Sequence, residues 1–329
     1  MPFPNPQNKE CLGYDCPLPR MGISPPLRLT PMRLFQQRHE DELVIWAPAK
    51  INLFLEVLGK RPDGYHAIAT LMLAIRRFDT LGITEDHSGA IQLHCNRSDL
   101  STGPDNLVVR AARLLQERTG CSRGCRLRLI KRIPMAAGLA GGSSDAAATL
   151  LGLNRLWQLG LATGDLEKLG AELGSDVPFF FHLPAAWCTG RGEIVTPVDF
   201  PRALDLVLVC PSFGCPTADV YRQVKVPEQP LDGAGMLAAA AAGDVEAIGR
   251  QLHNRLQPAA LTIAPKIAEI LDRVEALQPA GTLMSGSGST VFAVCRSRDE
   301  ALRIAKELRK NAGEFAVHVV RSCSAQHPR

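Results

Sequence analysis

The sequence has no run of about 18 consecutive apolar residues, the length that a membrane-spanning helix needs. It also lacks, near its start, the hydrophobic stretch of a secretory signal. We therefore expect a cytoplasmic protein with no membrane partner. Net charge is small as well, because 37 basic residues stand against 33 acidic ones and leave a formal charge of +4. So slight an excess argues against a nucleic-acid partner.

The ten cysteines form no Cys-x-x-Cys pair, and no histidine follows them at zinc-finger spacing. Cys121 and Cys125 are close in sequence, but one such pair alone is a weak indication of a metal site. We expect the cysteines to be small buried side chains in a reducing compartment. The sequence thus assigns no metal ligand.

The segment IPMAAGLAGGSSDAAATL at 133–150 is rich in glycine but lacks the marks of two common nucleotide loops. No lysine follows the glycines as in a Walker A loop, and the spacing is not that of a dinucleotide fold. What is there is Gly138, Gly141 and Gly142, then Ser143 and Ser144. Glycines let a backbone approach a ligand, and we expect one of the serines to cap a helix whose free N–H groups attract an anion. The pattern predicts a site for a di- or triphosphate, and a plain strand-to-helix turn is the alternative.

Two further segments have features of a binding site. MSGSGST at 284–290 is a glycine–serine turn between two expected strands, which alone would be an ordinary hairpin. Lys50 lies within the apolar stretch PAKINLFLEVLG, where an amine is costly unless an acid pairs with it. The candidate acid is Asp176 in GSDVPFFF, which by itself fits a helix-terminating turn better than a catalytic role.

The chain divides by composition into three parts. Residues 1–43 are proline-rich and without periodicity, so we expect a disordered extension and a fold that starts near Leu43. Residues 44–200 alternate strand and helix patterns and indicate an α+β domain. The expected strands there are 43–59, 89–95 and 121–132, and the expected helices are 106–120, from the two serines to Gly160, and 163–174. Residues 204–323 read β-α-β-β-α-β around a helical insert at 233–256, which is the ferredoxin-like order.

Three long motifs in this order resemble those of the GHMP kinases, the superfamily of galactokinase, homoserine kinase, mevalonate kinase and phosphomevalonate kinase. They are PAKINLFLEVLGKRPDGYHAI (48–68), PMAAGLAGGSSDAAA (134–148) and GTLMSGSGSTVFAV (281–294). Within the superfamily, PAKINL with RPDGYH and GSDVPFF is similar to the kinases of a cytidine-diphosphate-linked methylerythritol. The resemblance covers residues 46 to about 322. It implies the α+β two-domain GHMP kinase fold, a ribosomal protein S5 domain 2-like N-terminal domain followed by a ferredoxin-like C-terminal one.

The resemblance also implies an activity and its site. The γ-phosphoryl group of ATP, bound with Mg²⁺, would pass to the 2-hydroxyl of the methylerythritol unit, in the non-mevalonate route to isoprenoids. Asp176 would accept or orient the hydroxyl proton, and Lys50 would keep Asp176 ionised. The substrate-binding residues would be Asn52, Tyr65, His66 and Tyr221, with aromatic rings stacked on the cytosine. The ATP-binding residues would be Pro134, Met135, Ala136, Ala137, Gly138, Leu139, Ala140, Gly141, Gly142, Ser143, Ser144, Gly286, Ser287 and Gly288. The Mg²⁺ ligand is left unassigned, with Ser143 and Ser144 as the nearest candidates.

Two alternatives stay open at this point. The first is another activity of the superfamily, such as homoserine kinase or diphosphomevalonate decarboxylase, against which the RPDGYH segment argues. The second is a non-catalytic nucleotide-binding regulator on the same fold, which would have no use for both Lys50 and Asp176. The sequence departs from the family pattern only slightly, with Ala140 in place of a common glycine and Ser175 in place of a common alanine. We expect a monomer or a weak homodimer.

Overall fold

The computed structural model describes residues 36–39, 41–310, 313 and 315–324, all within one compact unit, Pro31–Arg329. The extension expected at 1–43 therefore lies largely outside the described residues. At its end, however, β1 (Gln36–His39) pairs antiparallel with β2 (Glu42–Lys60). The first described strand thus lies before Leu43. Its sequence, QQRH, has no apolar pattern, and pairing of backbone groups needs none.

The first sheet is built around the long antiparallel pair of β2 and β3 (His66–Asp86). Its order is β1-β2-β3-β5-β4, with β4 at Ile91–Cys95 and β5 at Gly124–Ile130. Two short strands extend this sheet: β6 (Ala185–Thr189) pairs with β3, and β7 (Ile194–Pro197) pairs with β6. The register of β2 against β3 shifts between Pro48 and Ala49 and again between Asn52 and Phe54, on either side of Lys50.

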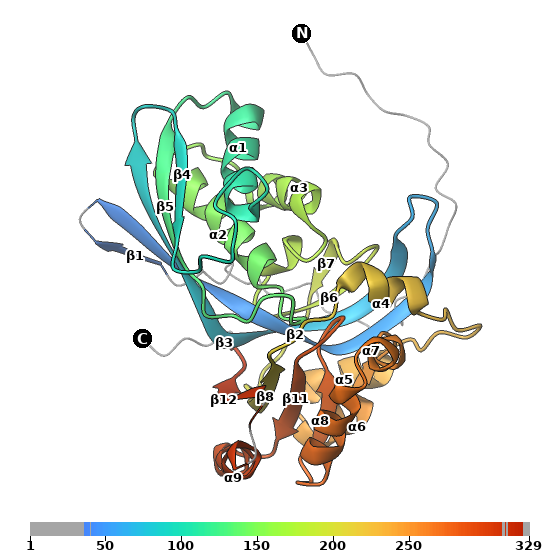
Figure 1. The fold of residues 1–329 in the computed structure, drawn as a ribbon. Helices are drawn as coiled ribbons and strands as arrows, with labels where there is room; N and C mark the ends of the chain where they lie inside the picture. The colour runs from blue at the N-terminus through green and yellow to red at the C-terminus, as the bar shows by residue number, and fades with distance from the viewer. Residues whose placement is uncertain (1–35, 40, 311–312, 314, 325–329) are drawn as a thin grey trace. The chain divides into compact units, whose positions relative to one another are not determined.

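Three helices, α1 (Leu107–Thr119), α2 (Gly141–Leu156) and α3 (Thr163–Leu173), lie together over one face of this sheet (Figure 1). The expected caps of α1 are confirmed: the Asn106 side chain accepts a hydrogen bond from Val108 N–H, and Gly120 ends the helix with φ of 67°. The helix expected at 163–174 is confirmed as α3. A short 3-10 helix, η1 (Pro178–Phe181), follows it.

The start of α2 differs from the expectation. The chain turns into the helix at Ala140, which has φ of 52°, so that Ser143 and Ser144 already lie inside α2. The expectation that one of these serines caps α2 is therefore wrong, and among the described residues no side chain does so. The helix also ends at Leu156 rather than near Gly160. Its first N–H groups are consequently left for a ligand.

The second sheet has the order β10-β11-β8-β12, and all its pairs are antiparallel. Its elements are β8 (Asp205–Pro211), α8 (Lys266–Glu275), β10 (Gly281–Met284), β11 (Val291–Cys295), α9 (Arg298–Arg309) and β12 (Phe315–Arg321). This confirms the expected ferredoxin-like order. Between β8 and α8 lie α4 (Thr217–Gln223), α5 (Ala234–Ala242), α6 (Val245–Gln251), β9 (His253–Asn254) and α7 (Gln257–Ile263). The insert is thus helical except for β9, which pairs in parallel with Phe54 and Leu55 of β2.

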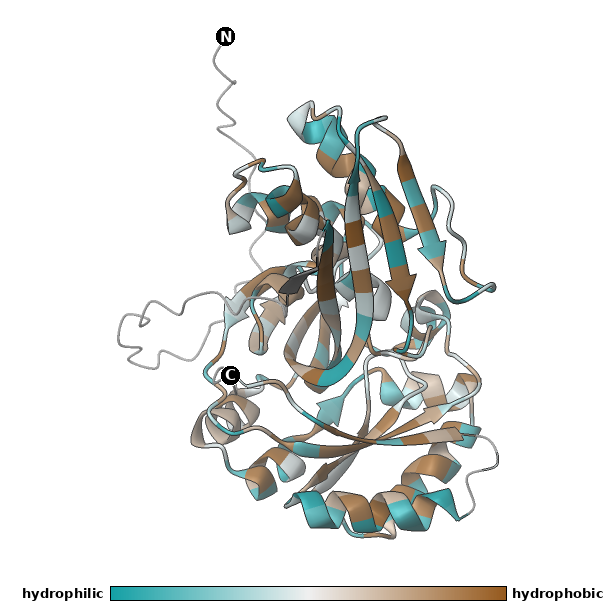
Figure 2. Ribbon diagram, turned by 90° about the vertical axis from the view of Figure 1, so that its left-hand side faces the viewer, coloured by the Kyte–Doolittle hydropathy of each residue, from teal (hydrophilic) through white to brown (hydrophobic). Residues whose placement is uncertain are grey.

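Burial follows the two-residue period of the strands. Leu206 and Leu208 of β8 pack with Ile51 of β2, whereas Val207 and Val209 pack toward α8 and α9. Both faces of the second sheet are therefore covered, which explains the continuous apolar run of β8. Hydrophobic residues follow the strands of both sheets and the helix faces against them (Figure 2). None of the described helices has the length and apolar character needed to cross a membrane.

Candidate active site

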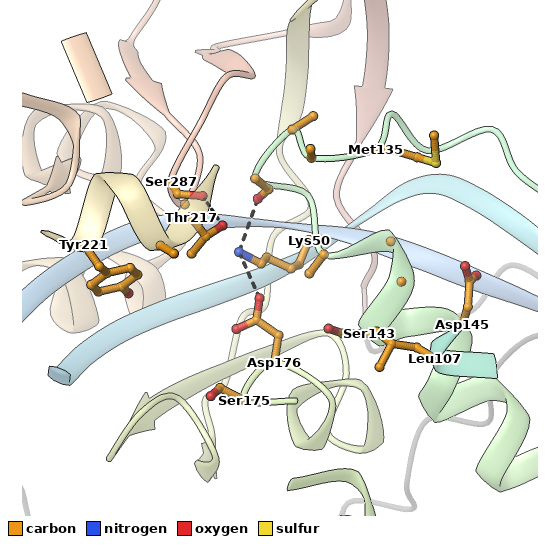
Figure 3. A pocket seen from close by; sticks show the side chains of 18 of the residues that line it. Lys50, Leu107, Met135, Ser143, Asp145, Ser175, Asp176, Thr217, Tyr221 and Ser287 are labelled. Carbon is orange, nitrogen blue, oxygen red and sulfur yellow. Dashed lines mark hydrogen bonds and ion pairs between the residues drawn. The ribbon is translucent and has the colours of Figure 1, made fainter. Parts of the chain in front are cut away.

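Lys50 is a buried amine at the meeting point of three segments distant in sequence (Figure 3). Its Nζ donates to Asn52 Oδ1 at 2.7 Å and to the Gly138 carbonyl at 3.2 Å. The same Nζ lies 3.5 Å from Asp176 Oδ2. The structure thus brings the two expected catalytic residues together as an ion pair, with Asp176 as the more exposed partner.

A short hydrogen-bond chain fixes the direction of the Lys50 ammonium. Asn52 Nδ2 donates to Thr70 Oγ1 at 2.8 Å, and the Thr70 hydroxyl donates to the Phe54 carbonyl at 2.6 Å. The amide of Asn52 is thereby oriented with its oxygen toward Lys50. Thr70 was not expected at the site, because only the pairing of β3 with β2 places it there.

The two glycine-rich motifs touch each other beside Lys50. The Gly138 carbonyl accepts from Ser285 Oγ at 2.9 Å as well as from Lys50. A Cβ on Gly138 would lie 2.0 Å from the Ser285 carbonyl oxygen, so no other residue fits there. Gly286, with φ of 55°, would place a Cβ 3.3 Å from Lys50 Nζ. Both motifs therefore form walls around the lysine.

These segments border a cavity of about 1210 Å³. Most of the residues expected to bind ATP line it: Pro134, Met135, Ala136, Ala137, Gly138, Ala140, Gly141, Gly142, Ser143, Gly286 and Ser287. Leu139, Ser144 and Gly288 were expected as well but lie outside the lining. Leu139 is buried and its carbonyl accepts from Lys50 N–H, and Ser144 is turned into the protein. A Cβ on Gly288 would lie 2.8 Å from Met284 Sδ, so this residue serves the turn itself.

The expected substrate residues also line the cavity, Asn52 next to Lys50 and Tyr65, His66 and Tyr221 at one end. The rings of His66 and Tyr221 stack with centroids 5.3 Å apart, and the Arg191 guanidinium lies 4.8 Å from the Tyr65 ring. Burial and, after it, the charge of Lys60 lower the pKa of His66, which is therefore neutral near pH 7. Burial raises the pKa of Tyr221, so its hydroxyl stays protonated.

The other end of the cavity was not foreseen. It is lined by Leu100, Ser101, Asn106, Leu107, Val108, Leu129, Lys131 and Asp145. In sequence, Asn106 and Leu107 had indicated only the start of a helix, and nothing local marked the rest. In Figure 3, Leu107 and Asp145 lie on the opposite side of Lys50 from Tyr221, Thr217 and Ser287. Thr217 was missed too, although its hydroxyl is 2.8 Å from that of Ser287 and both residues line the cavity.

The described residues contain no group of three or more His, Cys, Asp or Glu side chains placed to hold a metal. Cys121 and Cys125 are free thiols, and burial raises the pKa of Cys125 to about 12, which disfavours a thiolate ligand. Oxygen donors do occur beside the glycine loop. Ser143 and Asp176 both line the cavity, and in Figure 3 Asp176 lies directly below Lys50 with Ser143 to its side.

The family profile "GHMP kinases N terminal domain" matches residues 106–182, and "GHMP kinases C terminal" matches residues 236–314. The solved homoserine kinase of Cytophaga hutchinsonii superposes with a TM-score of 0.70 over 89% of this chain and 98% of its own. Its sequence is only 19% identical, so this likeness concerns the fold alone.

More similar relatives narrow the assignment. The 4-diphosphocytidyl-2-C-methyl-D-erythritol kinase of Shouchella clausii is 41% identical over 280 residues, which are 84% of this chain and 94% of the relative. A crystal structure of 4-(cytidine 5'-diphospho)-2C-methyl-D-erythritol kinase is 37% identical, with a TM-score of 0.72 over 85% of this chain and all of that one. The chain therefore belongs to the GHMP kinases and, within them, to the family of the 4-diphosphocytidyl-2-C-methyl-D-erythritol kinases.

Proposed function

We propose that this enzyme transfers the γ-phosphoryl group of ATP to the 2-hydroxyl of 4-diphosphocytidyl-2-C-methyl-D-erythritol, a step of isoprenoid precursor synthesis. The observation that carries the proposal is the Lys50–Asp176 pair, which lies in the cavity between a glycine loop and an aromatic end. The names of the relatives agree with this substrate. The aromatic end, with Tyr65, His66 and Tyr221, suits a cytosine ring.

The triphosphate of ATP would lie on the glycine loop. The N-terminus of α2 leaves its first N–H groups free and carries the positive end of a 16-residue helix dipole. The purine would then extend toward Leu107, Val108 and Leu129, the apolar part of the unforeseen end. The last phosphate would then lie beside Lys50.

The chemistry follows from the pair. As the acceptor oxygen bonds to the γ-phosphorus, the bond from that phosphorus to the bridging oxygen of ADP breaks. Asp176 accepts the proton that the acceptor hydroxyl loses. Lys50, held by Asn52 and the Gly138 carbonyl, forms an ion pair with Asp176 and faces the negative charge of the transferring group.

Mg²⁺ is the cofactor that we propose to accompany ATP, where it would neutralise phosphate charge. This ion commonly keeps most of its ligands from water and phosphate, with one or two from protein oxygens. Ser143 fits that role, since it lines the cavity beside the glycine loop. We further propose domain limits of 44–200 and 204–323 and a cytoplasmic enzyme that is a monomer or weak homodimer.

The first experiment is an ADP-release assay with Mg·ATP and four alcohols: the cytidyl substrate, mevalonate, homoserine and galactose. We expect ADP release with the cytidyl substrate alone. Turnover of another alcohol would contradict the proposed substrate, and tight ATP binding without any turnover would favour the regulator.

The role of Asp176 is tested by Asp176→Asn. The amide cannot accept the proton, so we expect kcat to fall by about 10²–10⁴-fold while the Kd of ATP changes by less than about twofold. Asp165→Asn is the matched control, because Asp165 forms an exposed pair with Lys168 on α3. Wild-type turnover by Asp176→Asn would show that Asp176 is not the base.

A further inference from the structure

Asn254 makes an unusual contact with the turn after β10. It is 5% exposed, and its Nδ2 donates at 2.8 Å each to the Met284 carbonyl at the end of β10 and to the Gly286 carbonyl in the turn. Its Oδ1 accepts from Leu256 N–H at 2.9 Å. Both donors of the amide are therefore used to hold the backbone of one turn.

The contact determines the direction of a peptide group at the cavity wall. The carbonyl of Gly286 and the N–H of Ser287 belong to one planar trans peptide, so they point in opposite directions. Because the carbonyl points at Asn254, the Ser287 N–H points away from it. Gly286 and Ser287 line the cavity, whereas Asn254 does not. With this peptide reversed, a carbonyl oxygen would take the place of the N–H and would repel a phosphate.

Asn254 is itself fixed to the strand that carries the catalytic lysine. It belongs to β9, which pairs with Phe54 and Leu55 of β2, and the next residue, Arg255, donates its N–H to the Leu55 carbonyl at 2.8 Å. The turn and Lys50 are thereby placed relative to the same strand. Gly286 also lies next to Lys50, where the last phosphates of ATP would be.

We propose that Asn254 is a positioning residue, which orients the Gly286–Ser287 peptide so that Ser287 N–H donates a hydrogen bond to the β- or γ-phosphate of ATP. This inference rests on the proposed function for the identity of the phosphate ligand. Asn254 acts through the turn and does not itself touch the nucleotide.

The test compares the binding of ATP and AMP to three variants by isothermal titration calorimetry, without any acceptor alcohol. Asn254→Asp keeps the shape of the side chain but cannot donate, and Asn254→Ala removes the amide. Gln257→Ala is the matched control, since Gln257 Oε1 accepts from Met284 N–H at 3.0 Å, on the strand before the turn. For both Asn254 variants we expect a Kd of ATP raised about 10- to 100-fold, the loss of one hydrogen bond to a charged group. The Kd of AMP, and both constants of Gln257→Ala, should stay within about twofold.

Two results would overturn the proposal. One is wild-type affinity for ATP in Asn254→Asp, and the other is an equal loss of ATP and AMP binding, which a merely structural defect would produce. Circular dichroism shows whether each Asn254 variant folds. If one of them does not, the other supplies the comparison. Lack of turnover by the wild-type enzyme with the cytidyl substrate would contradict the proposed function and leave the comparison of ATP with AMP valid.

Discussion

Single residues determine how closely the two glycine-rich motifs approach each other. Gly138 has φ of 74°, a conformation that residues with a Cβ rarely adopt, and the Ser285 carbonyl occupies the space that a Cβ would need. The Gly138 carbonyl also receives the hydrogen bond from Lys50. A larger residue here would separate the motifs and move an acceptor of the lysine.

We therefore predict that Gly138→Ala lowers the free energy of unfolding by about 2–4 kcal/mol, from overpacking together with left-handed strain. ATP binding should weaken as well. Urea unfolding and calorimetric titration measure the two effects. Gly164→Ala is the control, because a Cβ at Gly164 in α3 meets no atom within 4 Å and should raise the free energy of unfolding by about 0.5–1 kcal/mol. If both variants changed the free energy of unfolding in the same direction, this account of Gly138 would be wrong.

At this scale the sequence predicts the residues that lie within motifs. The glycines could be named because their segments already indicate a ligand, and Lys50 because an amine in an apolar strand needs a partner. Asp176 was assigned its role through the family resemblance, since by itself it fits an ordinary turn. Thr70 and Asn254 could not, because their partners are Asn52 on a neighbouring strand and a turn 30 residues away. Their roles arise from strand pairing, which leaves no local pattern.

Among the elements, α2 is tied to the first sheet by a buried charge cluster. Lys131, just after β5, forms ion pairs with Asp79 of β3 and with Asp145 of α2, the latter at 2.7 Å. Asp79 also accepts from the N–H groups of Arg132 and Ile133, whereas Asp145 Oδ1 has no partner among the described residues. Burial raises the pKa of Asp145 to about 7, and the charge of Lys131 offsets this only in part.

Because of this cluster, the free energy of unfolding should depend on pH. The pKa of Asp145 is higher in the folded state than its ordinary value of 3.8, so folding takes up a proton. Stability from this group is present at low pH and is lost as pH rises toward 7. Relative to Asp145→Asn, the free energy of unfolding of the wild type should fall by about 1–3 kcal/mol between pH 5 and pH 8, as measured by urea unfolding. A constant difference between the two proteins would contradict the assignment.

The elements themselves divide into those with local signals and those without. The helix α1 was predictable because Asn106 and Gly120 mark its ends. The start of α2 was not, since a left-handed Ala140 rather than a serine begins it. The two-residue strand β9 exists only through its partner β2, and an isolated pair of residues has no period to detect.

At the scale of the whole molecule, β2 contributes residues to all three hydrophobic clusters of the described residues. Along its length Ile45 packs under α1 to α3, Ile51 packs between the two sheets, and Val57 packs with residues of α7, α8 and α9. One polar contact reinforces this role. The fully buried Glu56 accepts from Arg255 at 2.7 and 2.8 Å and lies 3.1 Å from His253 Nε2, so it joins β2 to the insert of the second half.

Glu56 should therefore make the stability of the protein depend on pH in the acidic range. Burial raises the pKa of Glu56, but the hydrogen bonds from Arg255, His253 and two backbone N–H groups outweigh it, and the pKa falls from 4.5 to about 2. Because the folded pKa is depressed, this stability is present above pH 4.5 and is lost as pH falls toward 2. A shift of this size corresponds to about 3 kcal/mol.

Replacing Glu56 with glutamine should remove this loss of stability in acid. Glu56→Gln should be less stable than the wild type at pH 7, and the gap should narrow by about 2 kcal/mol between pH 5 and pH 3. Urea unfolding at several pH values measures the gap, which isolates Glu56 from the other carboxylates that titrate in this range. Glu172→Gln, which removes an exposed pair with Arg118, should cost less than about 1 kcal/mol at each pH. If the free energies of unfolding of the wild type and of Glu56→Gln changed with pH in parallel, the charge of Glu56 would not attach β2 to the insert. Apolar packing along β2 would then do so alone.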